Sequence, residues 1–291
     1  MTRPPIEVFG TTFQNPILLA SGTAGFGREV AGVLDLDRLG GLVTKAVSPE
    51  PRGGHPAPRV AEFPGGMLNA IGLANPGLER VAADELPWLE RHVRRARVVV
   101  NVVGTTEADY ATVVSRLTPL AIVTAFELNV SCPNTARGGE EFGADDEVLA
   151  ALVAGCRKVT RKPVIVKLAP TLPDVSRTAA AAAAAGADGF TLVNTMPGAL
   201  YREPGVNGAA SRLGYGQGGV SGPALLPVGV LATRRVRQKT GLPIIGVGGI
   251  RTIEDVDQYL EAGASLVAVG TAALADPRTP ERLVERWNSR G

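Results

Sequence analysis

Asparagine and lysine side chains stand at the ends of several short apolar segments of the chain. An apolar strand gains nothing by ending in an amide or an ammonium group unless that group meets water or a ligand. The set comprises Lys45, Asn101, Asn129, Lys167, Asn194 and Thr195, with Asn69 and Asn134 on adjoining segments. Amides suit a cyclic imide or a pyrimidine ring, and lysine can neutralise an anion. Any one of these asparagines could instead form a turn, but together they predict a binding site.

Glycine-rich segments form a second constellation. Gly248-Gly249 and Gly270-Thr271 each follow an apolar segment, and Gly222 precedes the first of them. Bare backbone N–H groups at such positions can approach a phosphate closely. The pattern predicts a phosphorylated ligand but does not distinguish a flavin mononucleotide from a sugar phosphate.

Cys132 lies just past an apolar segment and before Gly138-Gly139. A thiol with an ordinary pKa of about 8.5 can take up a proton as thiolate or through hydrogen-bonded neighbours. A lone cysteine is more often a buried apolar side chain, which is our interpretation of Cys156 in an apolar helix. The loop position of Cys132 favours a catalytic role.

The composition excludes several classes of protein. The net charge is +2 over 291 residues and the basic residues are scattered, so we expect no nucleic-acid surface. No segment reaches the ~20 apolar residues of a membrane helix, and no signal peptide is expected. Two cysteines cannot form a disulfide framework or ligate an iron–sulfur cluster. We therefore expect a soluble, cytoplasmic protein.

Histidine chemistry is also not expected. His55 and His92 are the only histidines, and both are predicted at the solvated surface. A His-based zinc site or a His-activated nucleophile is therefore not expected, and we predict no metal site.

Eight short apolar runs, typical of parallel strands covered on both faces, must position these residues. They span residues 16–20, 42–47, 97–103, 126–130, 164–169, 189–194, 244–248 and 266–270. Helices are predicted between them at 74–90, 107–116, 145–160, 174–185, 224–239 and 252–262. The alternation predicts an α/β protein with a (β/α)8 TIM-barrel fold, whose active site lies at the carboxyl ends of the strands.

A doubly wound open sheet is the alternative fold. Residues 246–251 carry the first two glycines of a dinucleotide fingerprint, but Arg251 occupies the third position. We find no linker and no repeat, so we predict a single domain over residues 1–291. The long polar stretch 197–219 predicts a lid or an insertion.

Several motifs resemble the dihydroorotate dehydrogenase family: Ser-Cys-Pro-Asn at 131–134, Thr-Lys-Ala at 44–46 and Asn-Ala-Ile-Gly-Leu at 69–73. The match runs from Asn15-Pro16 to Val269-Gly270-Thr271, nearly the whole chain. The cysteine separates it from the membrane-associated class 2, which uses serine. The glycines at 138–143 favour the NAD-linked class 1B over the fumarate-using class 1A.

The resemblance implies two sets of binding residues. FMN would be bound by Ser21, Lys45, Ala46, Asn101, Asn129, Lys167, Val193, Gly222, Gly248, Gly249, Gly270 and Thr271. Dihydroorotate would be bound by Lys45, Asn69, Ala70, Ile71, Gly72, Leu73, Asn129, Asn134, Asn194 and Thr195.

The resemblance also implies the reaction, which is the oxidation of (S)-dihydroorotate to orotate in pyrimidine biosynthesis. Cys132 would take the C5 proton while the C6 hydride goes to FMN. Class 1B implies a homodimer joined by an electron-transfer subunit with FAD and a [2Fe–2S] cluster, in a heterotetramer that reduces NAD+. The alternatives are a class 1A-like homodimer using fumarate, a flavin barrel acting on another pyrimidine, and a non-catalytic phosphate-binding barrel.

Overall fold

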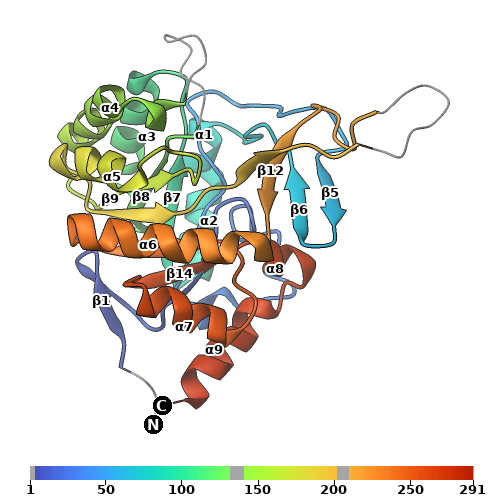
Figure 1. The fold of residues 1–291 in the computed structure, drawn as a ribbon. Coiled ribbons are helices and arrows are strands. Elements are labelled where there is room, and N and C mark those ends of the chain that lie inside the picture. Colours follow the sequence, from blue (N-terminus) through green and yellow to red (C-terminus); the bar gives the residue numbers. More distant parts are fainter. Residues whose placement is uncertain (1–3, 132–140, 202–209, 291) are drawn as a thin grey trace.

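Eight parallel strands close into a barrel in the computed structural model, which describes residues 4–131, 141–201 and 210–290 (Figure 1). The barrel strands are β3 (Ile17–Leu19), β4 (Gly41–Val43), β7 (Arg97–Val102), β8 (Val123–Asn129), β9 (Val164–Leu168), β10 (Gly189–Leu192), β13 (Ile244–Val247) and β14 (Leu266–Val269). Each pairs with the next in chain order, and β14 pairs with β3 to complete the ring. The eight predicted strands and the TIM-barrel fold are confirmed.

Side chains alternate along each barrel strand between two apolar layers. In β9, Val164 and Val166 join the large core between strands and helices, whereas Ile165 joins the smaller core inside the barrel. Successive residues of a strand point to opposite faces, so Lys167 also faces the barrel interior. The same rule turns Asn101, Glu127 and Thr191 of the site described below toward the barrel interior.

Helices surround the barrel (Figure 1). They are α1 (Leu78–Arg80), α2 (Leu86–His92), α3 (Glu107–Leu117), α4 (Asp146–Val159), α5 (Val175–Ala184), α6 (Leu226–Thr240), α7 (Ile253–Glu261), α8 (Thr271–Ala275) and α9 (Thr279–Ser289). A π-helical segment, η2 (Val81–Glu85), joins α1 to α2, and single 3₁₀ turns form η1 (Leu36–Arg38), η4 (Phe142–Ala144) and η5 (Pro223–Leu225). The six predicted helices are present; α8 and α9 were not predicted.

A two-stranded hairpin covers the amino-terminal end of the barrel. It consists of β1 (Ile6–Val8) and β2 (Thr11–Phe13), which pair antiparallel. Val8 and Phe13 are buried and belong to the same apolar cluster as Leu18 and Ile165 of the barrel interior. The hairpin therefore closes this end with apolar side chains.

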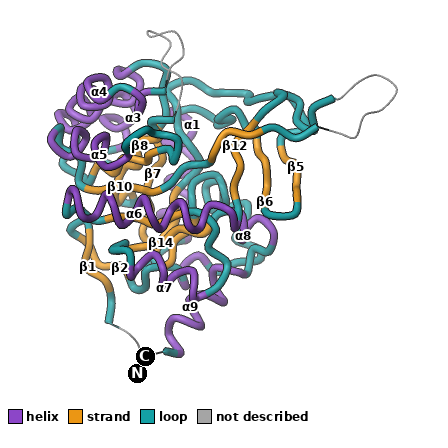
Figure 2. Tube along the Cα trace, in the orientation of Figure 1, coloured by secondary structure: helices purple, strands orange, loops and turns teal. Residues whose placement is uncertain are grey.

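A four-stranded antiparallel sheet lies on the opposite side of the barrel from the hairpin (Figure 1, Figure 2). Its strands are β5 (Val60–Phe63), β6 (Gly66–Asn69), β11 (Met196–Gly198) and β12 (Gly218–Ser221). The two ends of the predicted 197–219 insertion thus form β11 and β12, whereas the sequence predicts no strand there. Strand β12 pairs with β6, which joins the insertion to the segment before residues 70–73.

None of the helices in the described residues has both the length and the apolar character needed to cross a bilayer.

Candidate active site

Four polar side chains form a layer inside the barrel near the carboxyl ends of the strands. They are Asn101 on β7, Glu127 on β8, Lys167 on β9 and Thr191 on β10, and all four are buried. Glu127 Oε1 accepts a hydrogen bond from Asn101 Nδ2 at 2.6 Å, and Oε2 accepts one from Thr191 Oγ1 at 2.6 Å. Lys167 Nζ lies 3.9 Å from Glu127 Oε1. The structure thus brings two predicted residues, Asn101 and Lys167, onto one carboxylate.

Asn129 and Asn194 meet where β8 and β10 end. Asn194 Nδ2 donates to Asn129 Oδ1 at 3.2 Å, and Thr195 N donates to Asn194 Oδ1 at 2.9 Å. The backbone oxygen of Asn129 accepts a hydrogen bond from the buried Tyr110 hydroxyl at 2.7 Å. These contacts fix the two amides side by side at the barrel mouth, as the sequence analysis predicts.

The four-stranded sheet carries Asn69 to the same place. Asn69 Nδ2 donates to Gly219 O at 3.1 Å, across the β6–β12 pair. A Cβ at Gly219 would lie 2.1 Å from Thr195 Oγ1, so Thr195 packs directly on this glycine. Strand β12 therefore joins Asn69 to Thr195 and Asn194, although β6 and β12 are far apart in the chain.

Residues 70–73 form a strained loop beside the site. Gly72 and Leu73 both have a positive φ, 69° and 57°, and for leucine this conformation is uncommon. Asn75 holds the loop: its Nδ2 donates to Leu73 O at 2.8 Å and to Ser48 Oγ at 2.8 Å. Backbone strain of this kind persists only when the surroundings impose it, and it concentrates at functional sites.

Backbone hydrogen bonds anchor Ala70 and Ile71, the remaining members of this loop. Ala70 N donates to Arg59 O at 2.8 Å, and Ile71 O accepts from His55 N at 3.2 Å. Leu73 packs against the buried Ala46 and Val103. Leu73 of the predicted segment 70–73 thus lies in one apolar cluster with Ala46.

Lys45 is the second predicted cation. Its backbone N–H donates to Gly25 O at 2.8 Å, and the residue is partly buried. No carboxylate among the described residues forms an ion pair with Lys45, in contrast to Lys167. Lys45 can therefore meet an anionic ligand without first giving up a carboxylate partner.

Ser21 and Val193 lie just beyond the ends of β3 and β10. Ser21 Oγ donates to Thr44 O at 2.9 Å, which places it beside Lys45. Val193 is buried, and its N–H donates to Val247 O at 2.8 Å.

The predicted glycines gather around the start of α6. Gly222, Gly248 and Gly249 all have a positive φ. A Cβ at Gly249 would lie 2.7 Å from Leu226 Cβ, and one at Gly222 would lie 2.7 Å from Gly66 Cα. Only glycine fits these approaches without displacement.

The last two predicted phosphate-site residues join this group. Gly270 precedes α8, and Thr271 Oγ1 donates to Ser221 Oγ at 2.8 Å, next to Gly222. Within the described residues, the N–H groups of Gly249 and Gly270 have no hydrogen-bond acceptor. The cluster thus offers unused backbone donors, which suits an anion.

Cys132 and Asn134 lie outside the described residues. The last described residue before them is Ser131, whose Oγ is buried with no hydrogen-bond partner among the described residues. After them, Gly143 N donates to Val130 O at 3.1 Å, so Gly143 lies at the carboxyl end of β8. Burial raises the pKa of Glu141, two residues before Gly143. The predicted roles of Cys132 and Asn134 stay predictions.

The other cysteine and the histidines have different surroundings. Cys156 is fully buried in α4, and burial raises the pKa of its thiol to about 12, which confirms the core interpretation. His92 is exposed, as predicted. His55 is only partly exposed, since its ring stacks on Tyr215 at 3.7 Å between centroids, and the prediction of a solvated side chain was wrong.

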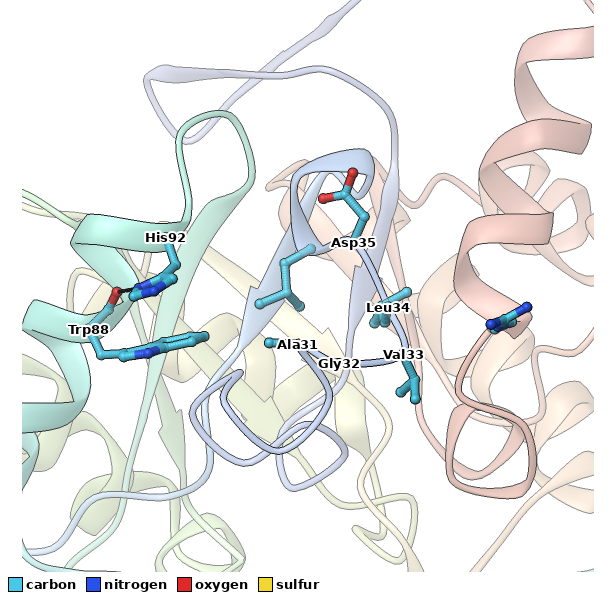
Figure 3. Close-up of a pocket in the computed structure, with 9 residues that line it drawn as sticks. Ala31, Gly32, Val33, Leu34, Asp35, Trp88 and His92 are labelled. Atoms are coloured by element: carbon cyan, nitrogen blue, oxygen red, sulfur yellow. Dashed lines mark hydrogen bonds between the residues drawn. The ribbon is translucent and has the colours of Figure 1, made fainter.

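A surface pocket of about 400 Å³ lies elsewhere, on the outside of the barrel (Figure 3). The segment 31–36, α2 and Arg278 line it, and the Trp88 and His92 rings stack at 4.1 Å in one wall. None of the predicted site residues lines this pocket. It also lacks the buried polar groups that converge at the barrel mouth, so we assign the active site to the mouth.

Sequence reasoning missed three residues that organise the site: Glu127, Thr191 and Asn75. The charge of Glu127 between the apolar Phe126 and Leu128 was a signal, because a buried carboxylate needs partners. Thr191 and Asn75 gave no comparable signal, since threonine is common in strands and asparagine in turns.

Comparisons with known proteins place the chain in a family. A family model described as dihydroorotate dehydrogenase matches residues 5–290. A Listeria welshimeri protein is 46% identical over 288 residues, which cover 98% of this chain and 92% of the relative. Proteins of Bacillus thuringiensis (46% over 285 residues, 98% and 91% covered) and Geobacillus kaustophilus (46% over 277 residues, 95% and 87% covered) are similarly close. All three are named dihydroorotate dehydrogenase B (NAD(+)), catalytic subunit.

Proposed function

Because the chain belongs to the dihydroorotate dehydrogenase family, we propose that it is the catalytic subunit of an NAD-linked enzyme that oxidises (S)-dihydroorotate to orotate. It is an oxidoreductase of pyrimidine biosynthesis. The observation that carries the proposal is the convergence of Lys45, Asn69, Asn129 and Asn194 at one mouth of a TIM barrel. We propose further that residues 1–291 form one domain and that the protein is cytoplasmic.

The residues present fit FMN, the cofactor that the family implies. The unused N–H groups of Gly249 and Gly270 suit its phosphate, and the buried Asn101 Oδ1, which has no partner among the described residues, suits an N–H group of its ring. We propose that FMN is held by Ser21, Lys45, Ala46, Asn101, Asn129, Lys167, Val193, Gly222, Gly248, Gly249, Gly270 and Thr271. When bound, FMN supplies the acceptor for the hydride that leaves C6 of dihydroorotate.

The amide cluster and Lys45 bind the substrate in this proposal. Dihydroorotate carries ring amides and one carboxylate, so it needs both hydrogen-bonding groups and a cation. The amides of Asn69, Asn129 and Asn194 supply the hydrogen-bonding groups, and the ammonium group of Lys45 supplies the cation. Ala70, Ile71, Gly72, Leu73, Asn134 and Thr195 complete the proposed substrate site. Fixed amides orient the ring before reaction, which lowers the entropic barrier.

Cys132 is the proposed base. It removes the proton at C5 of dihydroorotate as the C6 hydride departs, which leaves the C5–C6 double bond of orotate. Cys156 cannot share this role, because it is buried in α4 with its pKa raised to about 12. Lys167 places a positive charge beside the ring site, where it stabilises negative charge that develops in the reaction.

Electrons leave through another chain in this proposal. The segment 246–251 lacks the third glycine of a dinucleotide fingerprint, and two cysteines cannot ligate a cluster. We propose a homodimer joined by a subunit with FAD and a [2Fe–2S] cluster in a heterotetramer. The relatives named as NAD(+)-linked catalytic subunits favour this arrangement over a fumarate-using homodimer.

Dye reduction tests the function. The FMN-loaded chain should reduce an artificial dye with dihydroorotate and release orotate. Dihydrouracil, which lacks the carboxylate that Lys45 would bind, should react far more slowly. Equal rates with both compounds would favour a barrel acting on another pyrimidine, and a chain that takes up no FMN would favour a non-catalytic phosphate-binding barrel.

The electron acceptor is tested separately. The isolated chain should show feeble NAD+ reduction, and the complex copurified from its source should show iron–sulfur absorbance beside that of flavin. Robust NAD+ turnover by the isolated chain would contradict the partner, and rapid turnover with fumarate would favour the class 1A-like alternative.

A further inference from the structure

The Glu127 carboxylate lies in the interior of the barrel, two residues before Asn129, which ends β8 at the mouth. Ala125, two residues before it in β8, belongs to the apolar cluster inside the barrel, whereas Phe126 and Leu128 belong to the outer core. Glu127 therefore points inward, and it is only 1% exposed. An ionised carboxylate at such a depth is costly unless partners compensate it.

Three side chains from three other strands provide that compensation. Asn101 Nδ2 and Thr191 Oγ1 each donate a hydrogen bond of 2.6 Å, one to each carboxylate oxygen. Lys167 Nζ lies 3.9 Å from Oε1, and its side chain is 9% exposed. Both oxygens of Glu127 thus have partners within the protein.

The first consequence concerns the orientation of the Asn101 amide. A carboxylate only accepts hydrogen bonds, so Asn101 must turn its NH₂ group toward Glu127. Its Oδ1 then faces the other way, where it is buried and has no hydrogen-bond partner among the described residues. A buried carbonyl in this state is ready to accept an N–H donor from a ligand.

The second consequence concerns the charge of Lys167. Lys45, at the same mouth, has no carboxylate partner among the described residues, whereas Lys167 shares its layer with one. A negative charge 3.9 Å away offsets much of the positive potential that Lys167 presents to a bound ring. The two lysines of the site therefore present different positive potentials to a ligand.

We propose that Glu127 is a positioning residue for the flavin, which fixes the Asn101 carbonyl toward an N–H group of the cofactor and offsets the charge of Lys167. The first role sets the affinity for FMN, and the second keeps the flavin midpoint potential lower than Lys167 alone would set it. The inference rests on the proposed function, in that the ligand is taken to be FMN.

Glu127→Gln is the main test, because it removes the charge and keeps the shape. Glutamine also has an N–H donor, so Asn101 is no longer forced to present its carbonyl to the cofactor. We expect the dissociation constant of FMN for the flavin-free chain to rise about tenfold. We also expect the two-electron midpoint potential to rise by about 30 mV, which corresponds to a tenfold gain of the reduced over the oxidised cofactor.

Two further variants separate the roles and guard against misfolding of the first. Glu127→Asp keeps the charge but withdraws the carboxylate from Asn101, so FMN should bind more weakly with the potential unchanged. Glu85→Gln is the matched control, because it removes another buried carboxylate, which pairs with Arg28 and Arg80 beside η2 rather than at the mouth, so neither quantity should change. Unfolding of each flavin-free variant in urea shows whether it is folded.

The outcomes are distinct from those that test the function. Both measurements are made without dihydroorotate, so they do not depend on which pyrimidine reacts. A wild-type chain that binds no FMN would overturn the proposed function. If the wild type binds FMN and Glu127→Gln matches it in affinity and potential, only the role of Glu127 is overturned. The same holds if Glu85→Gln shifts both quantities as much as Glu127→Gln.

Discussion

The two ends of the barrel are built from different side chains. At the amino-terminal end, Phe13 and Val8 of the hairpin pack on Leu18 and Ile165, and the layer is apolar. At the carboxyl end, the interior layer holds a carboxylate, an ammonium group, an amide and a hydroxyl, all buried. Figure 1 shows the hairpin and the four-stranded sheet on opposite sides of the barrel.

The difference is visible within one strand. In β9, Ile165 belongs to the apolar layer and Lys167, two residues on, to the polar one, a separation of about 6.6 Å along the strand. The apolar end can be optimised for packing, while the other carries buried polar groups whose partners must be matched. The comparison therefore assigns stability to one end and ligand chemistry to the other.

Cys132→Ala should have the largest effect, and it acts on chemistry alone. Loss of a general base typically costs a factor of about 10²–10⁴, so flavin reduction by dihydroorotate should slow by that much in anaerobic stopped-flow mixing. Flavin content and urea stability should stay at wild-type values. Cys156→Ala, at the buried cysteine of α4, is the matched control and should leave the rate unchanged. Wild-type speed in Cys132→Ala would remove the base assignment.

Phe13→Ala tests the apolar end. Phe13 is 1% exposed, and truncating a buried phenylalanine destabilises a protein by about 3–5 kcal/mol. Urea denaturation should show this loss, whereas FMN affinity of the folded protein should not change. Val33→Ala is the control, because Val33 is 49% exposed. Its truncation should lower the free energy of unfolding by no more than about 0.5 kcal/mol. A parallel loss of FMN affinity in Phe13→Ala would show that the two ends are coupled.

Asp37→Asn tests the polar part of the same amino-terminal end. The Asp37 carboxylate accepts hydrogen bonds from the backbone N–H groups of Arg94, Arg95 and Ala96, which precede β7. Burial works to raise the pKa of Asp37, but the hydrogen bonds from Arg95, Ala96 and Arg94 outweigh it and hold the pKa below its ordinary value. Asp37→Asn weakens these hydrogen bonds, so the free energy of unfolding in urea should fall by about 1–3 kcal/mol at neutral pH.

The pH dependence of this difference follows from the sign of the shift. A carboxyl group with a lowered folded pKa stabilises the protein fully above its unfolded pKa, about 3.9 for aspartate. That contribution is lost as the pH falls through the lower folded value. The wild type and Asp37→Asn should therefore differ at neutral pH and converge below about pH 4. A difference that stays constant into acid would contradict the role of the charge.

Thr252→Ala should have the smallest effect. Thr252 caps α7 and accepts a hydrogen bond from Asp255 N at 3.4 Å, three residues after Gly249. Loss of such a cap costs about 1 kcal/mol, and FMN should bind at most about fivefold more weakly. Thr106→Ala removes an equivalent capping box from α3, which no glycine pair precedes, so it should lower stability equally without changing FMN affinity.

The barrel and most of the proposed site could be predicted from the sequence. Each barrel strand is a nearly continuous apolar run, and TIM barrels place their chemistry at strand ends, so Asn101, Asn129 and Asn194 were identified without a structure. The glycines at 248–249 and 270 were found for the same reason, because they follow barrel strands, and the positive φ of Gly248 and Gly249 favours glycine there.

Two kinds of feature could not be predicted. The strands of the hairpin and of the four-stranded sheet have three or four residues each, and β6 pairs with β12 across about half the chain, so no local pattern reveals them. Glu127 owes its role to Asn101, Lys167 and Thr191 on three different strands. Such a network depends on the strand register, which the sequence does not display.

A single anaerobic turnover tests the central claim most directly. The FMN-loaded wild-type chain is mixed with dihydroorotate in the absence of any acceptor, and flavin absorbance and orotate are measured together. We expect the flavin to bleach and about one orotate to form per flavin. A flavin that stays oxidised with dihydroorotate, although dithionite reduces it, would contradict the assignment of this chemistry to the carboxyl end of the barrel.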